Sequence, residues 1–228
     1  MECKRKLIVF LVCLIAWQFA IAQLAIIEDV DGYVNVRESS SVNSNIVYRL
    51  NSNEVFYYDE ENYLESNEWL AVSINKNKLS INLDPEWKLI SGFVHRSRIR
   101  PLQTLKIVTK NEFSFTVKTR KFTRKNKFIE ERNGYMEFIN GLHIWGVDGS
   151  VPYNEIKEIS YKINDSLYSI PEILFQDLYN VNDKIVVYTN NELYFVLNKN
   201  SDGAGSYEIV WVVDEKGMIR QRFVGKYY

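Results

Sequence analysis

The chain has 228 residues and a mass of 26.9 kDa, enough for one large domain or two small ones. Hydrophobic residues make up 46% and charged residues 25%, so the composition predicts a folded core and excludes a disordered or fibrous chain. The formal net charge of −1 excludes a nucleic-acid binder that depends on the charge of the whole chain, and we expect no nucleic acid among its partners.

The first 22 residues have the three parts of a secretory signal peptide. A basic stretch at residues 4–6 precedes an apolar stretch at residues 7–17, and Ala-Ile-Ala at residues 20–22 matches a signal peptidase site. The apolar stretch is too short to span a membrane comfortably. We therefore expect cleavage before Gln23 and a periplasmic or secreted protein with no stable membrane insertion.

Cysteine and histidine usage restricts the chemistry of the mature chain. Cys3 and Cys13 both lie in the expected signal peptide, so the mature chain has no disulfide and no cysteine nucleophile. His95 and His143 are too few for most catalytic zinc sites, and they lack the H-E-x-x-H spacing. We expect no metal site, no cofactor and no catalytic residue, and hence not an enzyme.

The region from residue 24 to residue 102 predicts short β-strands separated by polar turns. Residues 33–37 alternate between apolar and polar side chains, with Val34 and Val36 on one face. Further strands are expected at residues 46–50, 54–58, 69–72 and 92–95.

Four segments of this region together resemble a bacterial SH3-like (SH3b) domain. They are Asp31-Gly32-Tyr33-Val34-Asn35-Val36-Arg37, Ser44-Asn45-Ile46 with Leu50, Trp69-Leu70-Ala71-Val72, and Gly92-Phe93-Val94-His95-Arg96-Ser97-Arg98-Ile99. The chain departs from the family at Asn53, where Gly is usual, at Phe93, where Trp is commoner, and in a polar insertion at residues 73–91. The resemblance implies a small β-barrel over residues 23–102 and a role in recognising the cell envelope.

Strand alternation divides the side chains of such a barrel between core and surface. The residues expected in the core are Val34, Val36, Leu70, Val72 and Val94. The candidate ligand-binding residues face outward, and they are Tyr33, Arg37, Trp69, Phe93 and His95. Aromatic rings give a large contact area at low entropic cost, and an arginine can hold a ligand carboxylate through two hydrogen bonds. The alternative is that these aromatic residues pack against the second region or beneath residues 73–91.

Residues 103–228 predict a second β-rich domain, with the boundary near Pro101. Residues 113–119 alternate cleanly, and an antiparallel meander is expected at residues 185–188, 193–197, 207–213 and 218–224. A helix is expected over residues 171–178, because apolar residues recur there at four-residue spacing. The fold class expected is mainly β, with a small SH3-like β-barrel followed by an antiparallel β-rich α+β domain with one short helix.

Three other motifs in this region have structural explanations that we favour. Six basic residues between positions 118 and 127 suit a sheet edge or hairpin tip, with a patch for an anionic envelope polymer as the alternative. Residues 198–203 favour an Asx-rich loop, with Gly203 and Gly205 at positive φ, over a calcium loop. Residues 143–150 contain His, Asp and Ser, but favour a strand and an Asp-Gly turn over a catalytic triad.

The sequence thus favours an exported, non-catalytic binding protein. Its expected ligand is a peptidoglycan peptide or an envelope protein, recognised through residues 23–102. The alternative is a protein–protein interaction or an inhibitor or immunity-type role carried by residues 103–228. Neither the identity of the ligand nor the oligomeric state follows from the sequence.

Overall fold

The computed structural model describes residues 22–79, 81, 89–201 and 203–226. The expected signal peptide therefore lies outside the described residues, except for Ala22. The described chain is mainly β and consists of several antiparallel sheets, as expected from the sequence. Its α-helix, α1 (Glu60–Leu64), has only five residues, and no helix in the described ranges is long and apolar enough to cross a membrane.

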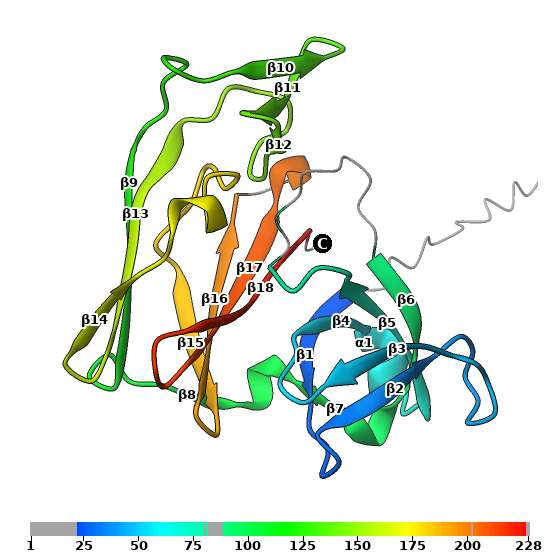
Figure 1. The fold of residues 1–228 in the computed structure, drawn as a ribbon. Helices are drawn as coiled ribbons and strands as arrows, with labels where there is room; N and C mark the ends of the chain where they lie inside the picture. The colour runs from blue at the N-terminus through cyan, green and yellow to red at the C-terminus, as the bar shows by residue number, and fades with distance from the viewer. Residues whose placement is uncertain (1–21, 80, 82–88, 202, 227–228) are drawn as a thin grey trace, which may run out of the picture.

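Residues 22–101 form one seven-stranded antiparallel sheet (Figure 1). Its strands are β1 (Ala22–Ile27), β2 (Tyr33–Arg37), β3 (Ile46–Asn51), β4 (Phe56–Asp59), β5 (Trp69–Asn75), β6 (Leu89–His95) and β7 (Ile99–Pro101). Their order is β3-β2-β6-β5-β4-β1-β7, so the hydrogen bonding leaves the sheet open where the sequence predicts a barrel. The five valine and leucine residues expected in the core are all buried.

Short helical turns connect several of these strands. Helix α1 follows β4 directly, because the Asp59 carboxylate caps it by accepting a hydrogen bond of 3.1 Å from the backbone N–H of Asn62. The 3₁₀ turns η1 (Arg96–Arg98) and η2 (Leu102–Thr104) flank β7. After η2 the chain enters the second region.

The second region contains three further antiparallel sheets. The five-stranded sheet has the order β18 (Ile219–Gly225), β17 (Tyr207–Asp214), β16 (Leu193–Asn200), β15 (Ile185–Asn190) and β8 (Lys106–Ile107). The first three-stranded sheet contains β14 (Ser166–Ser169), β13 (Asn154–Ile163) and β9 (Phe113–Lys121), and the other contains β10 (Ile129–Arg132), β11 (Tyr135–Ile139) and β12 (Leu142–His143). The predicted meander is confirmed as β15 to β18. The long β9–β13 hairpin carries the β10–β12 sheet at its far end (Figure 1).

The prediction of a helix over residues 171–178 is wrong. Only a 3₁₀ turn forms there, η3 (Glu172–Leu174). The chain after this turn pairs with a distant segment: the backbone N–H of Trp145 donates to the carbonyl of Asp177 at 2.8 Å, and that of Tyr179 donates to the carbonyl of Trp145 at 3.0 Å. This tertiary pairing overrides the helical preference that the apolar spacing suggested.

Strand β17 is buried on both faces, because a different layer covers each one. Tyr207, Ile209, Trp211 and Val213 belong to a core shared with the β9–β13 hairpin. Val210 and Val212 face the other way, into a cluster that joins the two regions. This joint cluster contains Leu24, Ile26, Val55, Tyr57, Leu102, Leu105, Tyr188, Phe195, Leu197, Val210, Val212 and Phe223. Burial on both faces explains the almost uninterrupted apolar run of β17.

Polar contacts fix the orientation of the two regions where they meet. The buried side-chain amide of Gln221 donates to the carbonyl of Val55 at 2.9 Å and accepts from its N–H at 2.7 Å. The Tyr57 hydroxyl donates to the carbonyl of Lys226 at 3.0 Å. Because these groups satisfy one another in a buried contact, a change in the relative orientation of the regions would break them.

Candidate functional site

A groove of about 450 Å³ lies on the seven-stranded sheet, where β2, β5 and β6 meet the turns that flank them. Four of the five predicted ligand-binding residues line this β2–β6 groove, namely Tyr33, Arg37, Trp69 and His95. Phe93, the fifth, is half-buried and does not line it. The alternation of β2 puts Tyr33 and Arg37 on one face, and the register of β5 with β6 places Trp69 opposite His95.

The aromatic part of the groove is held in place by contacts among its own residues. The rings of Trp69 and His95 meet edge to face, with centroids 5.5 Å apart. The Nδ1 atom of His95 lies 2.8 Å from the Ser97 hydroxyl and accepts from the Ser97 backbone N–H at 3.3 Å. Because Nδ1 accepts this bond, a neutral His95 carries its proton on Nε2. The ring therefore has a defined orientation before any ligand binds.

The cationic part of the groove is Arg37. Its guanidinium donates one hydrogen bond, from Nη1 to the carbonyl of Ser44 at 2.7 Å, and makes no other within the described residues. This bond ties the side chain to the loop after β2, while the guanidinium keeps further N–H donors for a ligand. Nearby, the Arg49 guanidinium lies 4.0 Å from the ring centroid of Tyr33 and covers one face of that ring.

Turn residues complete the groove, and the sequence reasoning missed them. They are Asp29, Asp31, Val42, Ser97 and Arg98. The buried Asp29 carboxylate pairs with Arg98 at 2.6 Å and accepts from the backbone N–H of Asp31 at 2.9 Å. The signal for this end of the groove is the Asp-x-Asp-Gly turn before β2, in which Gly32 has a φ of 77°.

The groove lies away from the contact between the two regions. All residues that line it fall between positions 29 and 98, and none of the four predicted residues in it belongs to the joint cluster. The described start of the 73–91 insertion packs elsewhere, since the backbone N–H of Arg222 donates to the carbonyl of Lys78 at 2.8 Å. These positions leave Tyr33, Arg37, Trp69 and His95 half-buried around the groove.

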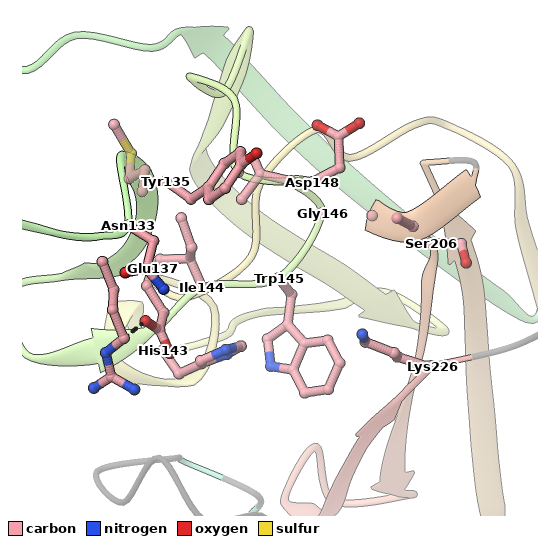
Figure 2. A pocket seen from close by; sticks show the side chains of 16 residues that line it. Asn133, Tyr135, Glu137, His143, Ile144, Trp145, Gly146, Asp148, Ser206 and Lys226 are labelled. Carbon is pink, nitrogen blue, oxygen red and sulfur yellow. Dashed lines mark ion pairs between the residues drawn. The ribbon is translucent and has the colours of Figure 1, made fainter.

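A second hollow, of about 500 Å³, lies in the second region (Figure 2). It is enclosed by β11, β12, the loop of residues 144–149, the turn η4 (Gly203–Gly205) and the end of β18, and we call it the 143–149 hollow. Here the His143 ring contacts the rings of Phe138 and Trp145, with centroids 5.6 and 6.1 Å apart. Its Nδ1 is buried and has no hydrogen-bond partner among the described residues.

The three chemical groups of the 143–150 motif are not joined into a triad. The Ser150 hydroxyl donates to the Asp148 carboxylate at 2.9 Å. Within the ranges that the structure describes, His143 forms no hydrogen bond with either residue. The motif therefore shows no hydrogen-bonded relay between a base and a hydroxyl.

Burial lowers the pKa of His143 below its ordinary value. The positive charges of Lys226 and Arg132 lower this pKa further, whereas the negative charges of Glu137 and Asp177 partly oppose the shift. The unfolded chain consequently binds a proton near pH 6.5 that the folded chain does not, so stability falls as the pH drops below this value. We expect His143→Gln to lose less stability than the wild type between pH 7.5 and 5.5. Urea unfolding at both pH values tests this, and equal losses in the two proteins would contradict it.

Most charges of the 118–127 basic run are paired. Lys118 pairs with Glu158 at 3.2 Å and Arg124 with Glu131 at 3.2 Å. The buried Glu155 carboxylate binds both Arg120 and Lys127, each at 2.7 Å. Because β9 is also an edge strand, these pairs favour the structural explanation over an anion-binding patch.

The 198–203 motif differs in detail from the expected loop. Asn198 and Asn200 lie fully buried in β16, and their side chains are hydrogen-bonded there. Among the described residues of this segment, Gly203 has positive φ as expected, and so does Ser201, whereas Gly205 does not. The described residues contain no group of three or more His, Cys, Asp or Glu side chains placed to hold a metal ion.

No family model, no curated protein and no solved structure matches this chain.

Proposed function

We propose that this protein is an exported, non-catalytic binding protein that recognises a cell-envelope ligand through the β2–β6 groove. One observation carries the proposal: four of the residues predicted from strand alternation line a single groove. The contact between the two regions does not cover these four residues. The resemblance of residues 24–102 to SH3-like domains supports an envelope ligand. The basic, apolar and Ala-Ile-Ala pattern of residues 1–22 supports export.

The chemistry of the groove suits a short peptide. Trp69 and Tyr33 offer ring surface, which binds with little loss of side-chain entropy. Arg37 offers charged donors for a peptide carboxylate, and the exposed Asp31 carboxylate suits an amine. A peptidoglycan peptide carries both kinds of group, and so does a segment of an envelope protein.

The competing proposal is a protein partner bound by the second region. The 143–149 hollow favours it, because this hollow lies on residues 132–226 and is independent of the groove. In that case the seven-stranded sheet serves as a scaffold, and changes in the groove leave binding intact.

Co-sedimentation of the purified protein with insoluble peptidoglycan tests the proposal. We expect the wild type to sediment and Trp69→Ala to bind at least about 30-fold more weakly, as for a central aromatic contact worth about 2 kcal/mol or more. The matched control is Phe128→Ala, which removes an exposed ring from the second region. It should sediment like the wild type.

The whole chain is needed in this experiment. Separate fragments would expose the apolar side chains of the joint cluster, so their failure to bind would be ambiguous. Circular dichroism and the melting temperature establish that Trp69→Ala is folded. Sedimentation of folded Trp69→Ala at the wild-type level would contradict the proposal, as would a wild type that does not sediment.

A further inference from the structure

The 143–149 hollow contains a charged donor that has no partner within it. Lys226 is exposed, and its ammonium group forms no ion pair or hydrogen bond within the described residues. Figure 2 shows the side chain extending from the end of β18 toward Trp145, over the hollow. A lysine held beside a concave surface in this way attracts an anion.

Backbone donors lie beside it. The N–H groups of the four consecutive residues 146–149 make no hydrogen bond with any described group. Two of these residues have left-handed backbones, Gly146 with a φ of 91° and Gly149 with a φ of 86°. Consecutive backbone N–H groups in a turn carry partial positive charges that can bind an anion.

This loop is fixed from behind. The carbonyl of Gly146 accepts hydrogen bonds from the Asn180 amide at 2.7 Å and the Ser201 hydroxyl at 3.4 Å. A Cβ atom at Gly146 would lie 2.1 Å from the carbonyl oxygen of Tyr179, so no larger residue fits without a shift of the backbone. The Gly146 end of the loop is therefore fixed before a ligand arrives, which reduces the entropic cost of binding.

The two carboxylates of the hollow each have a donor that is not Lys226. Glu137 pairs with Arg132 at 3.1 Å, and Asp148 accepts from Ser150 at 2.9 Å. His143 adds one more donor: because its buried Nδ1 has no partner, the neutral ring is best accommodated with its proton on Nε2. Within the described residues, neither carboxylate engages the Lys226 ammonium or the N–H groups of residues 146–149.

From these unpaired donors we infer that the 143–149 hollow binds the carboxylate or phosphate group of a small ligand, whose apolar part packs against Tyr135. The volume of about 500 Å³ is that of a small-molecule site. The ring of Tyr135 is 61% exposed and lines the hollow, so it offers apolar surface beside the donors. This site is independent of the β2–β6 groove and of the function proposed for it.

Titration of the ¹⁵N-labelled protein with benzoate, phenyl phosphate and benzamide tests the inference. Benzoate and phenyl phosphate share a ring and differ in the oxyanion, whereas benzamide keeps the ring and shape without the charge. We expect at least one of the two anions to shift the backbone signals of residues 146–149 and the imidazole signal of His143. The backbone signals of residues 185–190, which line neither the hollow nor the β2–β6 groove, serve as an internal reference and should not move.

A pair of lysine variants completes the experiment. Lys226→Gln should weaken binding of the anion about tenfold, as expected for the loss of a charge-assisted hydrogen bond. Lys121→Gln removes another exposed lysine that has no ion pair within the described residues, and it should bind like the wild type. Equal shifts with benzamide would overturn the inference. So would an equal effect of the two lysine variants, or the absence of a shift at residues 146–149.

Discussion

Replacing Asp177 by alanine is expected to lower the free energy of unfolding by about 3–5 kcal/mol. Asp177 and Arg222 form an ion pair in the core of the second region, with side chains 2% and 0% exposed. The Nη2 atom of Arg222 lies 2.7 and 2.8 Å from the two carboxylate oxygens. Removal of the carboxylate leaves the guanidinium charge buried without its counterion, and this loss dominates the cost. Urea denaturation of both proteins measures it.

A double variant distinguishes the effect of the buried charges from the effect of the volume that the two side chains fill. Replacing both residues, Asp177→Leu with Arg222→Met, removes both charges and keeps most of the volume, so we expect it to be more stable than Asp177→Ala. A loss below about 1 kcal/mol in Asp177→Ala would show that the pair contributes little to folding. A double variant less stable than Asp177→Ala would show that packing, and not the uncompensated charge, is responsible.

Phe223→Ala is expected to destabilise both regions together, by about 3–5 kcal/mol. Phe223 is fully buried in the joint cluster, and its ring meets that of Tyr57 edge to face, with centroids 4.9 Å apart. Tyr57 belongs to β4 and Phe223 to β18, so the cavity would open between the two regions. We expect one cooperative transition in both proteins, shifted to lower urea concentration in the variant.

Unfolding followed by two probes tests this coupling. Far-ultraviolet circular dichroism reports on all sheets, and the imidazole signals of His95 and His143 report on one region each. The probes should give coincident midpoints. Phe128→Ala, at an exposed ring, should change stability by less than about 0.5 kcal/mol. Separate midpoints for the two histidines, with only that of His143 shifted by Phe223→Ala, would contradict the coupling.

Much of the strand content could be predicted from the sequence, because alternation is a local property. Residues 33–37 are β2 as predicted, and the predicted strands of the meander differ from β15 to β18 by at most three residues at an end. Strand β1 could not be predicted, because its apolar residues follow the apolar stretch of the expected signal peptide and cannot be told apart from it. Helix α1 is too short to show a helical period, and the apolar spacing of residues 171–178 arises from tertiary packing of an irregular segment.

The candidate sites could be predicted only in part. Alternation identified the outward face of the seven-stranded sheet and hence Tyr33, Arg37, Trp69 and His95. It could not show that Phe93 lies outside the groove, nor that Asp29 and Arg98 close one end, because turns place these residues. The 143–149 hollow is lined by residues from Arg132 to Lys226, which the pairing of distant segments brings around it, and no local pattern indicates that arrangement.

The most direct test of the proposed function is a chemical-shift map of the ¹⁵N-labelled protein with soluble peptidoglycan stem peptides. A ligand in the β2–β6 groove should shift the backbone signals of residues 33–37, the indole signal of Trp69 and the imidazole signal of His95. Signals of residues 185–190, which line neither the groove nor the 143–149 hollow, should stay in place. Shifts confined to residues 103–226, or none at millimolar peptide, would contradict recognition of peptidoglycan peptides by the groove.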